Sequence, residues 1–452
     1  MPASSLRLRH ALLMATVLAS PFIATPSHAQ TTGAAAPAAK APLPNRVNDV
    51  LPRWLRVRGE LRERVEGIDN SGYTDGRDDV FSLTRVRLNV SVTSPYVGAT
   101  VQVADARVAG KDVGPVAPPF RAPFDLRQSF VDLGNAKTPV TARLGRQEMA
   151  YGDQRLIGPL NWLNTGRTFD GGTGVVRTKA ATVNLFAASV VRVFDNRADR
   201  SGNGNLLAGT YISMPKVIRK ATVDPYVIFH REHNQLTEAR VPGDLHQGTV
   251  GVRLAGGLPA ALDYNVEMGL QRGSLGSDEL SAWAGHWQLR RTFTGRTTPH
   301  LTAEYNRASG DESPTDGTRG TFDQLFGSPH DKLGLADLVG WRNISHVRVG
   351  FDVTPIKSTP ITVNWHDFRL VEARDGLYAA GGALVARIPA GAASTHVGNE
   401  LDVQATHPIT PQLALGVGYA RMFTGDFLKQ ATPGRSFGSG YLMLTWVFLA
   451  DR

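Results

Sequence analysis

The chain has 452 residues, with 49 Lys and Arg against 40 Asp and Glu, a formal net charge of +9 and no cysteine. The lack of cysteine excludes disulfides, thiolate metal sites and cysteine nucleophiles. The length would suffice for several soluble domains, yet no linker or change of composition divides the chain, so one large domain is predicted. Neither a cofactor nor a metal ion is predicted for it.

The first 29 residues have the order of parts of a secretory signal peptide. Arg7 and Arg9 precede an apolar run, and the segment closes on Ser27-His28-Ala29, which predicts cleavage after Ala29. Residues 30–53 are rich in Ala and Pro and are interpreted as a periplasmic lead-in. The ordered domain is therefore predicted to span residues 54–452, beyond the inner membrane.

Short stretches of alternating character recur along this domain. Residues 56–65, RVRGELRERV, place charged residues at every second position with mostly apolar residues between them, and similar alternation recurs at 88–93, 266–271, 347–352 and 401–404. Successive side chains of a strand point to opposite faces, so one face is apolar and the other wet. The repetition predicts an all-β, transmembrane antiparallel β-barrel of about 18 strands. The alternate positions that share one face of a strand are called a parity. Glu63 falls on the apolar parity of its strand, which predicts a strand end or a bulge there.

The connections between these stretches are of two lengths. Short ones at 94–96, 135–139 and 354–360 are predicted to be periplasmic turns, and long polar ones at 69–79, 109–123, 195–205, 309–343 and 373–395 to be extracellular or folded into the lumen. Aromatic residues near strand ends are predicted to form girdles at the membrane surfaces: Trp283, Trp287, Trp341, Trp365, Tyr419, Tyr441, Trp446 and Phe448.

Arginine dominates the charged parity. The clearest cases are Arg56, Arg58, Arg62, Arg64, Arg85, Arg87 and Arg348. A charge facing lipid would cost about 2–4 kcal/mol near the midplane, so these side chains should face the lumen. Arginine donates paired hydrogen bonds to carboxylates, and Glu60, Glu267 and Asp352 on the same parity would keep binding weak enough for passage. This pattern predicts a channel for carboxylated solutes.

Two separated groups of motifs resemble the alginate export family of outer-membrane barrels. The first contains LGRQE at 144–148, YGDQRLIG at 151–158 and NTGRTFD at 164–170; the second contains FDQLF at 322–326 and GWRN at 340–343. The resemblance implies a monomeric, porin-like channel for an anionic uronate polymer in a Gram-negative outer membrane. Its partners would be outer-membrane lipid and periplasmic secretion proteins.

The resemblance also implies lumen-lining residues that bind the solute. They are Arg58, Arg62, Arg127, Arg146, Gln147, Arg155, Asn164, Arg167, Arg342 and Arg348, to which the alternation adds Arg85 and Arg87. The run Gly171 to Gly174 departs from the family pattern and is interpreted as loop glycines. No catalytic residue is assigned.

Other classes of function have weaker support. A barrel hydrolase could use His286 or the pair His230 and His233, but there is no Gly-x-Ser-x-Gly or His-Glu-x-x-His motif, and the pair is predicted to lie in a strand-end loop. Residues 69–79 lack the spacing of an EF-hand and are interpreted as a solvated turn. Nucleic-acid binding is excluded because the basic residues alternate within strands. A general diffusion porin for small anions or sugars remains an alternative.

Overall fold

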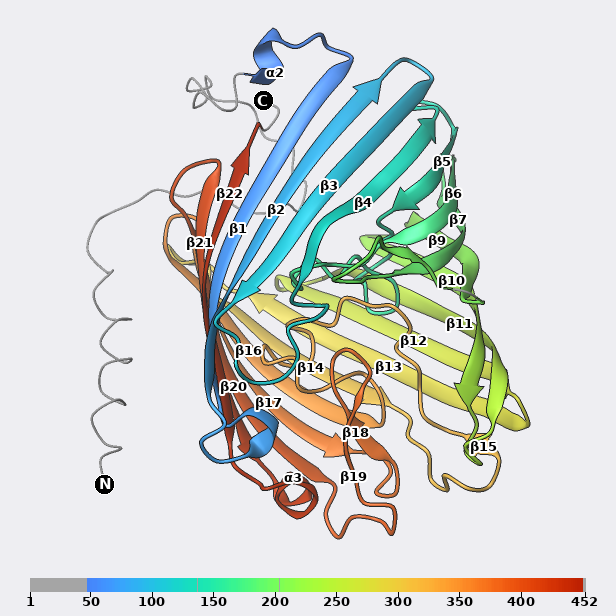
Figure 1. The fold of residues 1–452 in the computed structure, drawn as a ribbon, viewed down its shortest axis with the longest axis vertical. Coiled ribbons are helices and arrows are strands. Elements are labelled where there is room, and N and C mark those ends of the chain that lie inside the picture. The colour runs from blue at the N-terminus through green and yellow to red at the C-terminus, as the bar shows by residue number, and fades with distance from the viewer. Residues whose placement is uncertain (1–46, 136, 203, 450–452) are drawn as a thin grey trace.

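A computed structural model describes residues 47–135, 137–202 and 204–449. The predicted signal peptide and most of the predicted lead-in lie outside these residues. Eighteen long strands of the described chain form one closed wall, in which each strand pairs antiparallel with its neighbours in sequence and β22 returns to β1 (Figure 1). The predicted all-β barrel of about 18 strands is confirmed.

The wall is built from β1 (Leu55–Asp69), β2 (Asp79–Thr93), β3 (Val97–Ala109), β4 (Ala122–Leu133), β5 (Val140–Gln147), β6 (Phe169–Arg177), β7 (Thr182–Arg192), β9 (Leu206–Ile218), β10 (Ala221–Leu236), β11 (Pro242–Leu258), β12 (Leu262–Leu275), β13 (Asp278–Thr292), β14 (His300–Ala308), β16 (Ile344–Ile356), β17 (Thr359–Leu370), β20 (His396–Pro408), β21 (Leu413–Thr424) and β22 (Phe437–Phe448). The connections contain β8 (Arg200–Ser201), β15 (Thr318–Arg319), β18 (Gly376–Tyr378), β19 (Leu384–Arg387), α2 (Val47–Val50), η2 (Ser71–Tyr73) and α3 (Asp426–Ala431). None of the described helices has the length and apolar character needed to cross a bilayer.

The seam between the first and last strands is closed by main-chain pairing and is reinforced by the side chain of Asn48. The register runs from Gly59 opposite Phe448 to Asp69 opposite Gly438. Asn48 of α2 donates through Nδ2 to the carbonyl oxygens of Val57 (2.7 Å) and Leu449 (2.6 Å). Asn48 therefore links both sides of the seam at the end of the barrel where α2 lies (Figure 1).

Glu63 does not interrupt the first strand. The pairing of β1 with β2 continues through Glu63 opposite Thr84 without a register shift, and the Thr84 hydroxyl donates to the Glu63 carboxylate at 2.6 Å. The predicted strand end or bulge at Glu63 is wrong, because a hydroxyl on the neighbouring strand satisfies the outward-facing carboxylate.

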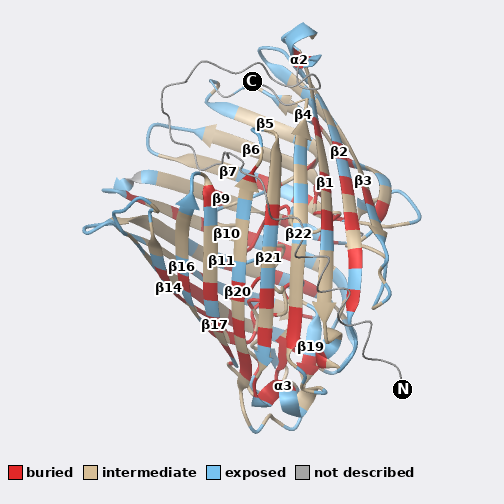
Figure 2. Ribbon diagram, turned by 90° about the vertical axis from the view of Figure 1, so that its left-hand side faces the viewer, coloured by how far each residue is buried: buried red, intermediate tan, exposed pale blue. Residues whose placement is uncertain are grey.

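The outer face of the wall is apolar and exposed. Leu144, Leu270 and Val349 are 55%, 52% and 51% exposed, although a water-soluble fold would bury side chains of this type. The exposed residues alternate along their strands with polar residues on the other face (Figure 2). Such an apolar outer band around a closed sheet is the surface that lipid covers in membrane barrels.

Two of the predicted girdle aromatics do not belong to this outer face. Trp341 is 4% exposed within a loop inside the barrel, and Tyr441 points inward, with its ring 4.9 Å from that of Trp162. Outward aromatics include Trp365 and Tyr419, which are 45% and 49% exposed. The girdle prediction was wrong for Trp341 and Tyr441 because an aromatic residue near a strand end can also pack against a loop in the lumen.

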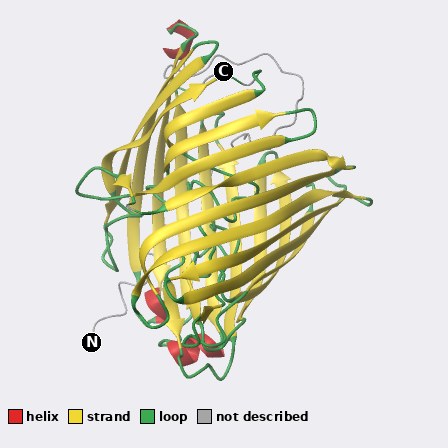
Figure 3. Ribbon diagram, turned by 90° about the vertical axis from the view of Figure 1, so that its right-hand side faces the viewer, coloured by secondary structure: helices red, strands yellow, loops and turns green. Residues whose placement is uncertain are grey.

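The hydrophobic core lies inside the barrel rather than between layers. The predicted short turns and long loops are confirmed, and the long loops lie at the end where α3 and β19 are found. Buried residues gather in the half of the barrel nearest that end, and loops cross the lumen behind the wall (Figures 2 and 3). The core joins loop residues such as Phe322 to inward wall residues such as Phe169 and Phe368, all fully buried. Because long loops mark the extracellular side, the filled half is extracellular.

Two predicted loops are strands. Gly171, Gly172 and Gly174 lie within β6, and residues 230–233 lie within β10. Gly171 faces inward, and a Cβ there would come within 2.5 Å of the Ala188 Cα on β7. Glycine is therefore needed for close approach of the two strands, and not for a turn.

We expect Gly171→Val to impair barrel assembly, because the added side chain must push β6 away from β7, at a cost of about 1–3 kcal/mol or more. Heat-modifiable mobility on gels measures the folded fraction. Gly67→Val is the matched control, since a Cβ at Gly67 of β1 meets no atom within 4 Å. An equal folded fraction for both variants would contradict the packing argument.

Candidate functional site

Two loops meet inside the lumen. The first lumen loop, residues 148–168, connects β5 to β6, and the second lumen loop, residues 309–343, connects β14 to β16 (Figure 1). Gly158 N–H donates to the Phe326 carbonyl (2.9 Å), and Phe326 N–H donates to the Leu156 carbonyl (2.9 Å). The Arg167 guanidinium donates to the Gly327 carbonyl at 2.8 Å. The loops therefore form one partition across the barrel.

Five inward arginines hold the tip of the first lumen loop. This arginine cluster consists of Arg62, Arg64, Arg85, Arg87 and Arg127, all buried. Arg62 and Arg85 donate to the Asn161 carbonyl at 3.1 and 2.8 Å. Arg87 and Arg127 donate to the Asn161 side-chain oxygen at 2.9 and 3.1 Å. Neutral oxygen atoms of the loop thus occupy cationic donors that could bind a carboxylate.

The neighbouring residues of the loop tip are fixed equally firmly. The Arg64 guanidinium lies 3.9 Å from the centre of the Trp162 ring, which stacks on His330 of the second lumen loop at 3.8 Å. Asn164 is 2% exposed and donates to the carbonyl oxygens of Phe120 (2.9 Å) and Thr84 (3.2 Å). Asn164 anchors the loop to the wall and to the loop between β3 and β4.

The arginine cluster is only partly compensated by carboxylates. Three ion pairs of 2.6 Å join Arg85 to Glu60, Arg64 to Glu66 and Arg127 to Glu148. Among the described residues, no carboxylate lies within ion-pair distance of Arg62 or Arg87. The Nε of Arg62 and both Nε and Nη2 of Arg87 are buried without a hydrogen-bond acceptor. Two guanidinium groups therefore retain donors for an anion.

Glu304 of β14 holds the other side of the partition. Its carboxylate accepts from Arg155 of the first lumen loop at 3.1 Å, from Asn306 at 2.8 Å and from Arg348 of β16. His286 Nδ1 lies 3.3 Å from the same carboxylate. Glu304 is fully buried as a side chain, so these donors supply the charge compensation that burial requires.

The second lumen loop docks on two further carboxylates of β20. Ala336 N–H donates to Glu400 at 3.0 Å, and Leu335 N–H donates to Asp402 at 2.9 Å. His366 Nε2 lies 3.0 Å from Asp402. The wall therefore presents cations to the carbonyl groups of one loop and carboxylates to the amide groups of the other.

Most of the site residues predicted from the sequence face the lumen or belong to its loops. Arg58 lies on the inward parity of β1 and is exposed. Gln147 is inward and accepts from Thr173 at 3.0 Å, while Arg342 stands 3.8 Å from Asp323. The structure brings Arg62, Arg85, Arg87, Arg127 and Asn164 together on one wall, and places Arg155 and Arg348 together on the opposite one.

Arg146 is the exception, because it faces outward. Its neighbour Gly145 pairs with Phe130, which faces inward, so Gly145 also faces inward. Leu144, which lies on the same face of the strand as Arg146, is 55% exposed. Arg146 forms a 2.7 Å ion pair with Asp170. The prediction that Arg146 lines the lumen is wrong. Adjacent residues of a strand cannot share a face, and Gln147 occupies the inward position.

Sequence reasoning also missed residues that organise the lumen. Asn161 and Trp162 carry no alternating pattern, since they lie in a loop, and only the structure shows that they meet the arginine cluster. Glu304 could have been found by extending the parity of β14, on which Thr302 and Asn306 also face inward. The histidines considered for a hydrolase do not converge, because His230 points inward while His233 is an exposed outward residue.

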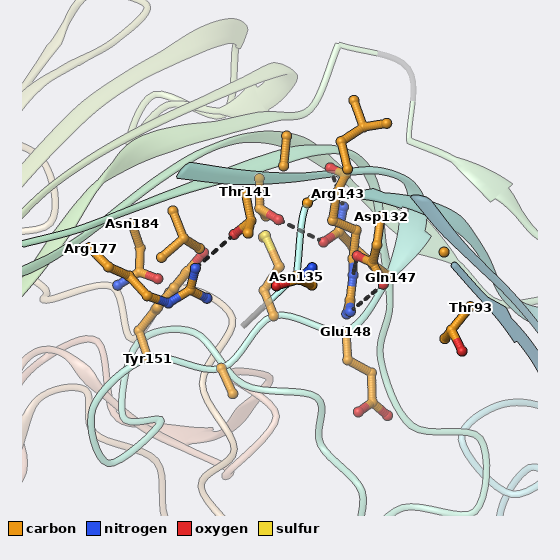
Figure 4. Close-up of a pocket in the computed structure, with 18 of the residues that line it drawn as sticks. Thr93, Asp132, Asn135, Thr141, Arg143, Gln147, Glu148, Tyr151, Arg177 and Asn184 are labelled. Atoms are coloured by element: carbon orange, nitrogen blue, oxygen red, sulfur yellow. Dashed lines mark hydrogen bonds and ion pairs between the residues drawn. The ribbon is translucent and has the colours of Figure 1, made fainter. Parts of the chain in front are cut away.

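A cavity of about 490 Å³ lies on the periplasmic side of the first lumen loop (Figure 4). Its lining includes Thr93 and Asn135 at the short-turn end, and Arg143, which forms a 2.7 Å ion pair with Asp132. Arg177 donates to the Thr141 hydroxyl at 3.1 Å. The cavity therefore joins the periplasmic mouth to the base of the partition and offers a cation without a carboxylate partner among the described residues.

The extracellular mouth is held by Asp375 in the connection between β17 and β20. Its carboxylate accepts from Asp311 N–H of the second lumen loop (3.0 Å), from the Tyr378 hydroxyl (2.7 Å) and from Arg387 (3.0 Å). Burial, together with Glu238 and Asp375, raises the pKa of Asp311 to about 7. Asp311 therefore stays protonated to a higher pH than an exposed aspartate does.

In the described chain, eighteen antiparallel strands with an apolar outer face and charged residues on the inner one define a transmembrane β-barrel of the outer-membrane type. The chain belongs to the alginate export family, because its residues 53–439 match the sequence pattern of that family. No protein of curated function matches the chain in sequence.

Similar solved structures share this fold. Pseudomonas aeruginosa OccK8 (OprE) is 12% identical with a TM-score of 0.58, covering 87% of this chain and 98% of that one. P. aeruginosa OccD3 (OpdP) is 11% identical with a TM-score of 0.57, covering 88% and 91%. Acinetobacter baumannii OccAB4 is 11% identical with a TM-score of 0.56, covering 87% and 98%. At these identities the likeness concerns the fold alone.

We expect Glu304→Gln to destabilise the barrel by about 3–5 kcal/mol, because it leaves Arg155 and Arg348 without their buried carboxylate. Unfolding in urea, followed by tryptophan fluorescence in micelles, gives the free-energy change. The control is Asp132→Asn, which removes the partly exposed ion pair with Arg143 and should cost at most about 1 kcal/mol. Equal losses would show that the Glu304 pairs are not the tie between wall and loop.

The contact of the second lumen loop with the mouth should weaken as pH rises. The folded-state pKa of Asp311 lies above its ordinary value, so the folded loop binds more protons and its stability falls between about pH 4 and pH 7. Hydrogen exchange of residues 309–321, corrected for the intrinsic rate, should be faster at pH 8 than at pH 5. Asp311→Asn should abolish this difference, and a difference that persists would show that Asp311 is not its source.

Proposed function

We propose that the protein is a passive outer-membrane channel for an anionic polysaccharide of the uronate type or for another carboxylated solute. The leader motif supports export of the chain, with cleavage near Ala29, and the apolar outer band supports insertion in the outer membrane of a Gram-negative bacterium. One chain closes the wall, so no second copy is needed to form the lumen, and the barrel would act as a monomer. Periplasmic secretion proteins would deliver the solute to the short-turn side.

The observation that carries this proposal is the excess of guanidinium donors on one arc of the inner wall. Arg58 and Arg177 face the periplasmic half without carboxylate partners among the described residues, and Arg62 and Arg87 keep unpaired donors deeper in the lumen. These arginines form a series from the mouth to the partition. Solute carboxylates would pass along it by repeated weak binding, as conduction requires.

The first lumen loop would act as a competitor of the solute. Its Asn161 oxygens are neutral acceptors on Arg62, Arg85 and Arg87. A carboxylate adds charge–charge attraction and can accept two parallel hydrogen bonds from one guanidinium. A solute carboxylate would displace the loop tip from the arginine cluster. Glu60 and Glu148 beside the cluster would limit the affinity and allow release.

The test is current through single channels in a planar bilayer. We expect anion-selective conductance that uronate oligosaccharides block at lower concentrations than neutral oligosaccharides of equal length do. In Arg62→Gln/Arg87→Gln, the anion preference from reversal potentials under a salt gradient should fall at least about threefold, as expected from the loss of two lumen charges.

Arg107→Gln is the control for this experiment, because Arg107 lies on the outer face and is 59% exposed as a side chain. It should leave the selectivity unchanged. Equal block by neutral sugars would favour the general diffusion porin, and unchanged selectivity in the double variant would remove the arginine cluster from the solute path.

A further inference from the structure

A second group of arginines faces away from the lumen. In the described chain it comprises Arg107, Arg146, Arg231, Arg272, Arg307, Arg369 and Arg421, here called the outer arginine belt. Each lies at most five residues before the extracellular end of a strand that runs toward the long loops. Phe229 and Leu270, two residues before Arg231 and Arg272 on the same face, are 56% and 52% exposed. The belt therefore borders the apolar band on its extracellular side.

The belt is compensated on some strands and bare on others. Ion pairs join Arg107 to Asp105 (2.6 Å), Arg146 to Asp170 (2.7 Å), Arg369 to Asp367 (3.0 Å) and Arg421 to Asp69 (2.5 Å). Arg231 of β10, Arg272 of β12 and Arg307 of β14 have no carboxylate within ion-pair distance among the described residues. These three residues form the bare arc of the belt, on alternate strands of one side of the barrel.

The strands between these arginines leave room for a ligand. Arg272 is flanked by Gly248 of β11 and Ser281 of β13, and Arg307 faces Ser345 of β16. A Cβ on Gly248 would find no atom nearer than 3.8 Å, so the surface beside Arg272 is open. Small neighbours expose the guanidinium groups, whereas large side chains there would cover them.

Part of the Arg272 charge remains available outward. Arg272 uses Nη1 on the carbonyl oxygens of Gln271 (2.7 Å) and Ala282 (3.3 Å), which fixes its guanidinium and leaves its other donors free. Two outward carboxylates lie on the strands between these arginines, Asp244 on β11 and Glu279 on β13. Asp244 is engaged by His233 at 2.9 Å, and Glu279 lies two residues nearer the loops than Ser281.

We propose that the bare arc binds the phosphate groups of the phosphorylated glycolipid that forms the outer leaflet of the outer membrane. Acyl chains of such a lipid would cover the apolar residues below the belt, which places its phosphates at the height of the guanidinium groups. Arginine matches phosphate with paired hydrogen bonds and keeps its charge at any physiological pH. The compensated part of the belt, which already holds carboxylates, has less affinity for an anion.

The outer wall separates this surface from the proposed solute path. The arginines of the bare arc and those of the arginine cluster lie on opposite faces of the sheet, and on strands that are not neighbours. The glycolipid would therefore anchor and orient the barrel without entering the lumen. Loss of the bare arc should leave ion selectivity unchanged.

The test is binding of purified, detergent-solubilised full-length protein to bisphosphorylated lipid A, with dephosphorylated lipid A as the ligand control, measured by native mass spectrometry. In Arg231→Gln/Arg272→Gln/Arg307→Gln, the affinity for the bisphosphorylated form should fall at least about tenfold, given the contribution of each basic residue at a lipid surface. The dephosphorylated form should bind weakly to every variant. Heat-modifiable mobility verifies folding, and Arg272→Gln alone serves if the triple variant does not fold.

The matched control is Arg219→Gln/Arg291→Gln/Arg296→Gln, which removes the same charge at the periplasmic end and should bind like the unmodified protein. Equal affinity for both forms of lipid A, or unchanged binding by the triple variant of the bare arc, would overturn the proposal. Binding of phosphatidylglycerol with the same affinity as bisphosphorylated lipid A would also overturn it, because the arc would then attract any anionic lipid. Failure of the channel experiment would leave these outcomes unaffected.

Discussion

In a closed antiparallel sheet, every strand residue faces either the bilayer or the lumen. The pairing of β1 with β22 removes all edges, and a strand alternates its side chains with a period of two, so no residue can avoid the choice. Charged residues on the inward parity must then be compensated inside a confined space. The loops, the ion pairs and the position of the core all depend on this constraint.

The two lumen loops supply that compensation through their peptide groups. Carbonyl and side-chain oxygens of Asn161 accept from the arginine cluster, and amide groups of residues 335 and 336 donate to Asp402 and Glu400. Apolar loop side chains such as Phe322 fill the space between them and form a core within the wall. A peptide group is a weaker partner than an ion, and the proposed displacement of the loop by a solute carboxylate depends on this difference.

Arginine serves two surfaces of the same wall. Inside, Arg62 and Arg87 are buried against a loop and lack carboxylate partners among the described residues. Outside, Arg231 and Arg272 border the apolar band, where a headgroup instead of a loop would meet them. The inner and outer arginines differ in the face of the strand on which they lie and in their distance from the strand end. A count of positive charges in the sequence cannot separate them.

Alternation alone was enough to determine the class of the protein. It predicted a closed transmembrane barrel of about 18 strands, with Arg62, Arg85 and Arg87 inward, because a period of two is a local property that survives in any sheet. Its failures were also local. Glu63 was taken for a strand end, although a partner hydroxyl satisfies it, and the glycines of β6 were taken for a loop, although they permit close strand contact.

Tertiary structure decided what the lumen contains. Arg146 was assigned to the lumen by its motif, yet the register gives the inward position to Gln147. Residues 148–168 form a loop that turns back into the barrel and meets arginines of three distant strands. Contacts between residues so far apart in sequence depend on strand register and loop direction. Both are fixed only when the wall closes, and so no stretch of sequence contains them.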